Sequence, residues 1–186
     1  MAINVENINT GGAIVKIGAT TALNTVDADG FVIGLATGVD VGATTGGVKI
    51  AYSYETQDIY CDQHLAAVET AIISETATVE FEMLESDSDN LRYAIGLYES
   101  SDDASDKKTS VGGKTIPQYY ALELTIPDND APSARNVVWT FFKTRSQGFE
   151  SNFERENPTT IKVTFTAYAN TSFASGHQLF SINEDI

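Results

Sequence analysis

Apolar and polar residues alternate along much of this sequence, a pattern that predicts a chain built mainly of β-strands. The clearest case is TVEFEM (78–83), whose Val, Phe and Met side chains would point one way and whose Thr and Glu side chains the other. The same period of two recurs in VKIAYSYE (48–55) and in TIKVTFTAYA (160–169). Further strand-like runs are expected at 13–18, 116–126 and 136–144.

The period changes in SDSDNLRYAIG (86–96), which predicts one short helix. Leu91, Ala94 and Ile95 would fall on one face of that helix. Ser86 is the expected N-cap, and Gly96 suits the C-terminal exit. The acidic residues just after Ser86 would lie in the first turn, where the helix dipole favours anions.

The remaining segments lack such periods. We expect an N-terminal arm at 1–12, a long loop at 19–47 and a mobile acidic loop at 99–115. Within the long loop, the apolar island GFVIGLATG (30–38) is expected to form one short strand. The length of 186 residues favours a single domain over 1–186. Strands in series with one helix predict a mostly β fold, an antiparallel β-sandwich or barrel with one flanking α-helix.

The formal net charge of −15 is concentrated in one part of the chain. From Glu55 to Asp106 there are 14 acidic residues and one base, Arg92, which is a net charge of −13 (1 − 14). Such a surface repels nucleic-acid phosphates and acidic membranes, because binding to either depends on Lys and Arg. Glu80 and Glu82 face no obvious lysine ladder in neighbouring segments, so we expect their face to be strongly negative.

The sequence indicates a soluble protein without disulfide bonds. No apolar run approaches the about 20 residues that span a bilayer. MAINVENINT has neither the basic start nor the apolar stretch of a secretory signal, so we expect a protein made and soluble in the cytoplasm. Cys61 is the single cysteine, which excludes an internal disulfide framework.

No pattern indicates catalysis, and we expect no enzymatic activity and no cofactor. His64 and His177 accompany no nucleophile motif, and with one cysteine they give no zinc-ligand spacing. Glu80 and Glu82 could in principle form the carboxylate pair of a glycosidase, about 7 Å apart on one strand face. A solvated acidic face is the favoured interpretation of that pair.

Three acidic stretches resemble parts of calcium sites, but turn or cap chemistry explains each more simply. DADG (27–30) has its Gly at the fourth position of a calcium loop, and its twelfth position is Gly38, where Glu is required. PDNDAP (127–132) is similar to the calcium linkers between cadherin-type repeats, but no flanking repeat is present. SDSDN (86–90) is explained as a helix cap. We therefore expect no metal.

An ordered series of motifs at 46–96 resembles the major tail proteins, or tail tube proteins, of long-tailed bacteriophages. GGV leads into the first strand, and TQDIYCDQ resembles that family's acidic strand ending in an Asp-Gln pair. AVETAIISETATVEFEMLE resembles its ascending strand with alternating Thr and Glu, and SDSDNLRYAIG its following helix. The resemblance covers about 50 of 186 residues and departs from the family pattern at Cys61 and His64, beside the Asp-Gln pair.

The resemblance implies a β-sandwich subunit that assembles into hexameric rings, which stack into a tube. An inner sheet of each subunit would join its neighbours in a continuous β-barrel around a negatively charged lumen. The candidates for lining the lumen are Asp58, Asp62, Glu69, Glu80 and Glu82. The N-terminal arm and the two predicted loops would contact other rings or the exterior.

The partners implied are further copies of the chain and the tape measure, tail completion and tail-tip proteins. DNA would pass through the tube without specific binding, and the protein, made in the host bacterial cytoplasm, would end in the tail of the virion. The acidic composition fits this role independently, because a conduit must not bind what passes through it.

Two other functions are open. A β-sandwich module that binds carbohydrate or protein would need an exposed aromatic platform. The candidates for it are Tyr119, Tyr120, Trp139 and Phe141. Another phage structural protein, from a baseplate or a capsid decoration, is the nearer alternative.

Overall fold

The computed structural model describes residues 12–23, 31–62, 66–103, 105–113, 116–127, 136–153 and 158–184. Over these residues the chain is mostly β with antiparallel pairing and one α-helix, which confirms the predicted fold class. The elements in chain order are β1 (Ile14–Ala19), β2 (Val39–Asp40), β3 (Thr44–Ile59), β4 (Glu69–Met83), α1 (Ser88–Ile95), β5 (Glu99–Asp102), β6 (Lys107–Ser110), β7 (Tyr120–Pro127), β8 (Asn136–Asn152), β9 (Thr160–Ala167) and β10 (Phe180–Glu184).

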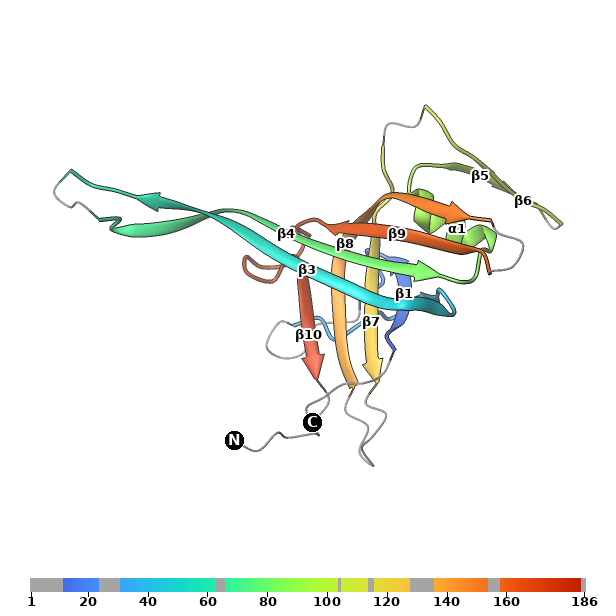
Figure 1. Cartoon of the computed structure of the whole chain (residues 1–186), viewed down its shortest axis with the longest axis horizontal. Helices are drawn as coiled ribbons and strands as arrows, with labels where there is room; N and C mark the ends of the chain where they lie inside the picture. Colours follow the sequence, from blue (N-terminus) through green and yellow to red (C-terminus); the bar gives the residue numbers. More distant parts are fainter. Residues whose placement is uncertain are drawn as a thin grey trace.

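The main sheet forms two layers that cross each other (Figure 1). One layer contains β2, β1, β7, the first half of β8, and β10, which also pairs with β8. The other contains the second half of β8, then β9, β4 and β3. In Figure 1, β7 and β10 run nearly perpendicular to β3, β4 and β9, as in an orthogonal sandwich. The described strands do not close into a barrel.

Strand β8 turns the corner between the layers. It pairs with β7 as far as Thr144 and with β9 from Thr144 onward. The register shifts on both sides of this corner, once between Phe141 and Thr144 and once between Ser146 and Phe149. Gly148 lies in the second shift at φ 113°, a backbone conformation that L side chains rarely adopt. These bulges allow one strand to belong to both layers.

The core lies between the layers and is built from alternate strand residues. Val79, Phe81 and Met83 are buried, whereas the intervening residues of β4 are half-buried, as the alternation at 78–83 predicts. Phe81 stacks on Phe165 of β9 with ring centroids 5.8 Å apart. Fully burying side chains of this size stabilises the fold by roughly 1.5–3 kcal/mol each.

Helix α1 begins one residue later than the predicted cap implies. Asp87, and not Ser86, is the N-cap, and its carboxylate accepts a hydrogen bond from the Asn90 amide at 2.7 Å. Gly96 ends the helix in the left-handed conformation at φ 66°, as predicted. The Asn90 side chain donates to Val41 O at 3.0 Å, which ties the helix start to the segment between β2 and β3.

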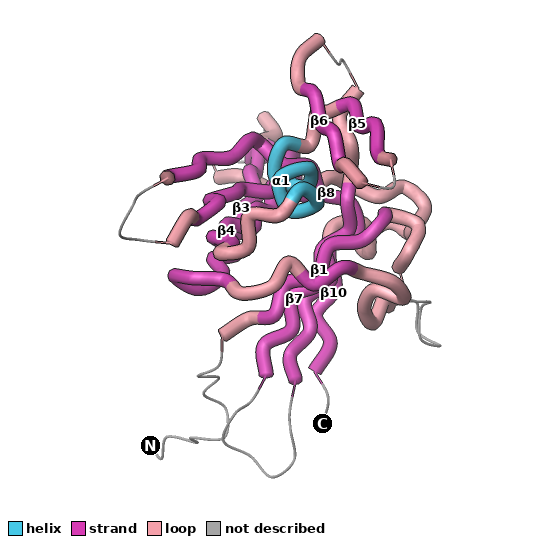
Figure 2. Tube along the Cα trace, turned by 90° about the vertical axis from the view of Figure 1, so that its right-hand side faces the viewer, coloured by secondary structure: helices cyan, strands magenta, loops and turns pink. Residues whose placement is uncertain are grey.

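The expected loop at 99–115 contains a two-stranded sheet, so that prediction is wrong over β5 and β6. Figure 2 shows this hairpin beside α1, at the opposite end of the molecule from the tips of β7 and β10. The buried side chain of Arg92 holds the hairpin, donating to Asp102 Oδ2 and to Thr109 Oγ1, each at 2.8 Å. Both strands are exposed and polar, so no apolar alternation marks them in the sequence.

The described part of the expected loop at 19–47 also differs from its prediction. GFVIGLATG is not a strand over its described residues, where Leu35 forms an isolated bridge with Leu23. Glu123 of β7 holds the segment around Leu35 in place. Its buried carboxylate accepts hydrogen bonds from the Leu35 amide at 2.6 Å and from Lys16 Nζ at 3.1 Å. Residues 24–30, and the expected N-terminal arm except Gly12, lie outside the described residues.

We predict that Arg92→Gln releases the β5–β6 hairpin while leaving the sandwich folded. Glutamine removes the charge-assisted bonds to Asp102, so amide hydrogen exchange in β6 should accelerate at least about tenfold, as expected for a local opening. Exchange in β7 should be unchanged. Lys108→Gln is the matched control, because it removes an exposed cation that pairs with Asp103, while the Lys108 backbone carbonyl that accepts from Arg92 remains. Unchanged exchange in Arg92→Gln would contradict the anchoring role.

Candidate assembly arm and sheet face

The β3–β4 hairpin extends beyond the rest of the molecule as a two-stranded arm (Figure 1). We define the arm as residues 51–62 and 66–76. Pairing of β4 with β9 ends at Thr78 and Thr166, so no third strand covers the arm in the described part of the chain. Its outer edges therefore present backbone N–H and C=O groups without a strand partner, which favours pairing with another chain.

Both faces of the arm are exposed, and large apolar side chains lie on them. Their exposed fractions run from 46% for Tyr52 to 64% for Tyr60. The set comprises Tyr52, Tyr54, Ile59, Tyr60, Val68, Ile72 and Ile73. Single exposed apolar residues are ordinary, but a gathering of this kind marks an interaction surface. Because an isolated two-stranded hairpin is only marginally stable in water, contact with a partner would stabilise the arm.

The structure divides the five acidic residues predicted to line a lumen. Glu80 and Glu82 point away from the core, because they alternate with buried residues of β4. Glu69 lies on the same face as Glu80. The cross-strand partners of these two residues are Ile59 and Lys49 of β3. Because β3 alternates regularly and the two partners are an even number of residues apart, their side chains point to the same side. Asp58 lies on the opposite face, and Asp62 lies in the turn beyond β3.

One extra residue in β4 places Glu69 on the same face as Glu80. Ser74 pairs with Glu55 and Ile72 pairs with Thr56, which leaves Ile73 as a bulge. Such a bulge increases the local twist of a hairpin and moves its side chains to new directions. The bulge lies at the base of the arm, so it shapes the point at which the hairpin leaves the body.

The face with Glu80 and Glu82 does carry lysines, which corrects the expectation that no lysine ladder faces them. Lys162 of β9 is the cross-strand partner of Glu82, and its Nζ lies 2.7 Å from Glu80 Oε1. Lys49 of β3 is the cross-strand partner of Glu80. The hydrogen bond from Lys162 is the main reason that the pKa of Glu80 lies below its ordinary value. Strand pairing brings these lysines in from segments distant in sequence.

The arm itself has no Lys or Arg, and hydroxyl groups partner three of its carboxylates. Across the hairpin, Thr70 donates to Asp58 at 2.9 Å, and Ser74 donates to Glu55 at 3.1 Å. Tyr52 Oη donates to Glu75 at 3.1 Å. The pKa of Tyr52 is raised, by burial first and by this bond to Glu75 second. These bonds orient the acidic side chains and leave their negative charge uncompensated.

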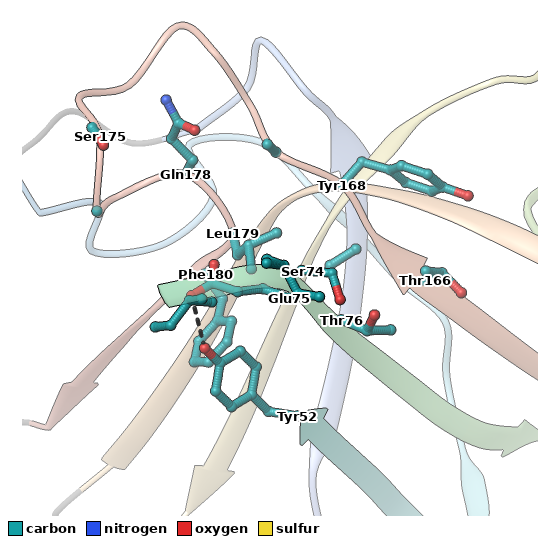
Figure 3. A pocket seen from close by; sticks show the side chains of 15 residues that line it. Tyr52, Ser74, Glu75, Thr76, Thr166, Tyr168, Ser175, Gln178, Leu179 and Phe180 are labelled. Atoms are coloured by element: carbon teal, nitrogen blue, oxygen red, sulfur yellow. Dashed lines mark hydrogen bonds between the residues drawn. The ribbon is translucent and has the colours of Figure 1, made fainter. Parts of the chain in front are cut away.

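A groove lies beside the base of the arm (Figure 3). Its volume is about 890 Å³. Residues 72–76 of β4 form one side, and the segments 166–169 and 175–180 form the other. Tyr52 and Phe180 supply aromatic surface, with ring centroids 5.7 Å apart. The groove begins where β9 ends, so it continues the position that a third strand would take beside β4.

Two cations lie on tyrosine rings next to this groove, and we call the four residues the cationic ledge. Lys143 Nζ lies 4.5 Å from the ring centroid of Tyr119, and Arg145 Cζ lies 5.2 Å from that of Tyr168. The two tyrosine rings meet edge to face at 5.7 Å. Sequence patterns contain no signal for the ledge, because its members come from three separate segments.

The aromatic platform considered for a binding module does not form. Phe141 is fully buried, and Tyr120 is 8% exposed. Trp139 stacks on Phe180 at 5.7 Å, within the packing around the core. Of the four candidates, Tyr119 lies instead in the cationic ledge. The tyrosines and tryptophan are therefore not arranged as one flat exposed surface.

The described residues contain no group of three or more His, Cys, Asp or Glu side chains that could hold a metal ion. DADG, His64 and all of PDNDAP except Pro127 lie outside them, and SDSDN supplies the N-cap of α1. The ring of His177 meets that of Phe31 edge to face at 4.9 Å. None of the described helices is long and apolar enough to cross a membrane.

Comparison of the sequence with protein-family models and with curated proteins gives no match. The geometry of the arm and of the sheet face is therefore the basis for assigning a function.

We predict that Lys162→Met raises the pKa of Glu80 toward its ordinary value of 4.5. The depressed pKa means that the pair stabilises the fold above about pH 4.5 and ceases to do so as the pH falls through the folded-state value. Carboxyl-carbon NMR titration measures the shift. Lys49→Met is the control and should move the pKa less, because Lys49 acts only through space. An unchanged pKa of Glu80 in Lys162→Met would contradict the pairing.

Proposed function

We propose that this chain is a structural subunit of a phage tail tube, which assembles into hexameric rings that stack into a hollow conduit for the genome. The observation that carries the proposal is the arm, which leaves the body with free edges and exposed apolar side chains. The resemblance of 46–96 to tail tube proteins supports the same conclusion. In this role the chain has no catalytic activity and needs no cofactor.

The layer of β3, β4, β9 and the second half of β8 is suited to joining copies edge to edge. Strand β3 ends the sheet on one side. On the other side, the layer ends with the second half of β8. The edge of β8 that faces away from β9 pairs with β7 only up to Thr144, and no described strand lies beside Phe149–Asn152 on that edge. Phe153, just beyond, is 78% exposed. Pairing β3 of one copy with β8 of the next would make a continuous sheet and cover both edges.

The outward face of this layer would line the lumen. Of the lumen-lining candidates, Glu69, Glu80 and Glu82 lie on it and Asp58 does not. With Glu55 and Glu150 the face carries five acids, against the bases Lys49, Arg145 and Lys162, for a net charge of −2 (3 − 5). Passing phosphates would be repelled only at short range, because charges are screened beyond about 8 Å at physiological salt. The lining acts as a coating that DNA does not bind.

Six copies would bring together a formal charge of −90 (6 × −15), so assembly has to overcome self-repulsion. Burial of the apolar side chains of the arm and strand pairing at free edges are the favourable contributions available. The other partners in this role are the tape measure, tail completion and tail-tip proteins. The protein would be made in the host bacterial cytoplasm and act in the tail of the virion.

Electron microscopy of the purified protein tests the proposal. We expect rings or tubes with a hollow axis at high protein concentration. Rings that never stack would favour the nearer alternative of a baseplate or capsid decoration protein. A monomer that persists across salt and protein concentrations would overturn the proposal and favour a carbohydrate- or protein-binding module.

We predict that Tyr54→Ser combined with Ile72→Ser raises the concentration needed for assembly at least about tenfold. Each side chain contributes roughly 1.5 kcal/mol or more if assembly buries it. Both are more than half exposed in the single chain, so folding should be unaffected. Val111→Ser with Ile116→Ser is the matched control, because these residues are also exposed but lie off the arm. Light scattering against concentration measures the threshold, and equal thresholds for both pairs would contradict the role of the arm.

A further inference from the structure

The two cations of the cationic ledge lack an acidic partner in the described part of the chain. Lys16, Arg92, Lys107, Lys108 and Lys162 each lie within 4.0 Å of a carboxylate. Lys143 and Arg145 have no such partner within the described part of the chain, and tyrosine rings contact them instead. In a chain with 26 acidic and 11 basic residues, two neighbouring cations free of acids form a surface complementary to an anion.

The ledge and the groove form one continuous surface. Tyr168 belongs to both, because its ring lies under Arg145 and it also lines the groove. Figure 3 shows Tyr168 and Thr166 at one end of the groove, and Leu179 and Phe180 across from β4. A ligand lying along this surface would meet apolar side chains such as Ile72, Leu179 and Phe180 in the groove, interspersed with hydroxyl and amide groups and the carboxylate of Glu75, and positive charge at its end. It would therefore be an extended segment that is both apolar and acidic.

The arm has this combination of properties. Between residues 51 and 76 it has five acidic residues and no Lys or Arg. The acids are Glu55, Asp58, Asp62, Glu69 and Glu75. Its large apolar side chains lie among these acids on both faces of the hairpin and are exposed. The arm is thus complementary to the groove in hydrophobicity and to the ledge in charge.

We propose that the arm of one copy docks in the groove of a second copy, with its carboxylates against Lys143 and Arg145. Arg145 lies on the outward face of its layer, next to the corner of β8 at Thr144, so the docked arm would cover that face only beside this corner. The inference rests on the proposed self-assembly and assigns the receptor surface for the arm. The arm in question is that of another copy, because the arm of the same chain forms one side of the groove, and Figure 1 shows it extending away from the body.

The reach of the arm suits this contact. Its nine strand residues from Ala51 to Ile59 extend roughly 30 Å at about 3.4 Å per residue. That length places the tip well outside its own body, within range of a neighbouring body. Because the outer part of the arm, beyond the residues that line the groove, is a different surface from the groove, the contact is heterologous and can repeat from copy to copy. Each copy would then give an arm and receive one.

A charge swap tests the docking. The ledge variant carries Lys143→Glu and Arg145→Glu. The arm variant carries Asp58→Lys and Glu69→Lys, which lie on opposite faces of the hairpin near its tip. Each variant should raise the assembly threshold at least about tenfold, because like charges then face each other. The chain that carries all four changes keeps the net charge of −15 and should assemble near the wild-type threshold.

The outcomes separate the two claims. Arg145→Glu alone should also raise the threshold. Lys49→Glu is its single-charge control and should change the threshold less, because Lys49 lies outside the groove and the ledge. A ledge variant that assembles normally, or a swap that does not restore assembly, would overturn the docking even if tubes form. Wild-type protein that forms no rings or tubes would instead overturn the proposed function. Thermal unfolding of each variant checks that it is folded.

Cross-linking from the arm gives a second, independent test. Cys61 is the only cysteine and lies just beyond the end of β3, so a photoreactive maleimide attaches at the tip of the arm. In assembled protein, mass spectrometry should find cross-links to peptides spanning 143–145 and 166–180 of another copy. Mixing isotope-labelled and unlabelled chains identifies links between copies. Links from assembled protein to other regions alone would overturn the docking.

Discussion

The end of the β4–β9 pairing at Thr78 and Thr166 is the constraint on which the rest of this structure depends. Up to that point, β4 has a strand on each side and an apolar face against the core. Beyond it, no third strand joins the hairpin in the described part of the chain, yet the hairpin keeps its pairing and its exposed apolar side chains. A two-stranded ribbon is marginal in water, so a segment of this kind has the properties of an interface.

The packed body supports the base of the arm. Strand β8 enters both layers through two bulges, which joins the crossed sheets into one packed unit around Phe81 and Phe165. The layer that continues into the arm is therefore anchored by the core and by the second half of β8. Its outward face carries acids partly balanced by lysines, whereas the arm carries acids without any cation. The same outward face continues onto the arm, where it carries Glu55 and Glu69.

Local patterns in the sequence were enough to predict the helix, the mostly β class and parts of β1, β3, β4, β7, β8 and β9, but not β5, β6 or β10, because alternation and capping are properties of neighbouring residues. Contacts between distant residues could not be predicted in this way. Lys162 reaches Glu80 only once β9 pairs with β4, and Arg92 orders the polar β5–β6 hairpin through Asp102. The separation of Asp58 from Glu69 depends on a bulge at Ile73, which shifts the alternation by one residue. The sequence predicts ordinary strand over the arm, because no local signal shows where a third strand stops.

Hydrogen–deuterium exchange of the arm at increasing protein concentration tests the central claim most directly. Amides on the outer edges of residues 51–59 and 69–76 have no strand partner among the described residues of the single chain, so they should exchange quickly in dilute protein. If the arm is the assembly element, these amides become protected as the protein assembles, while amides in β7 remain unchanged. Assembly that leaves the arm amides as fast as in dilute protein would contradict the account.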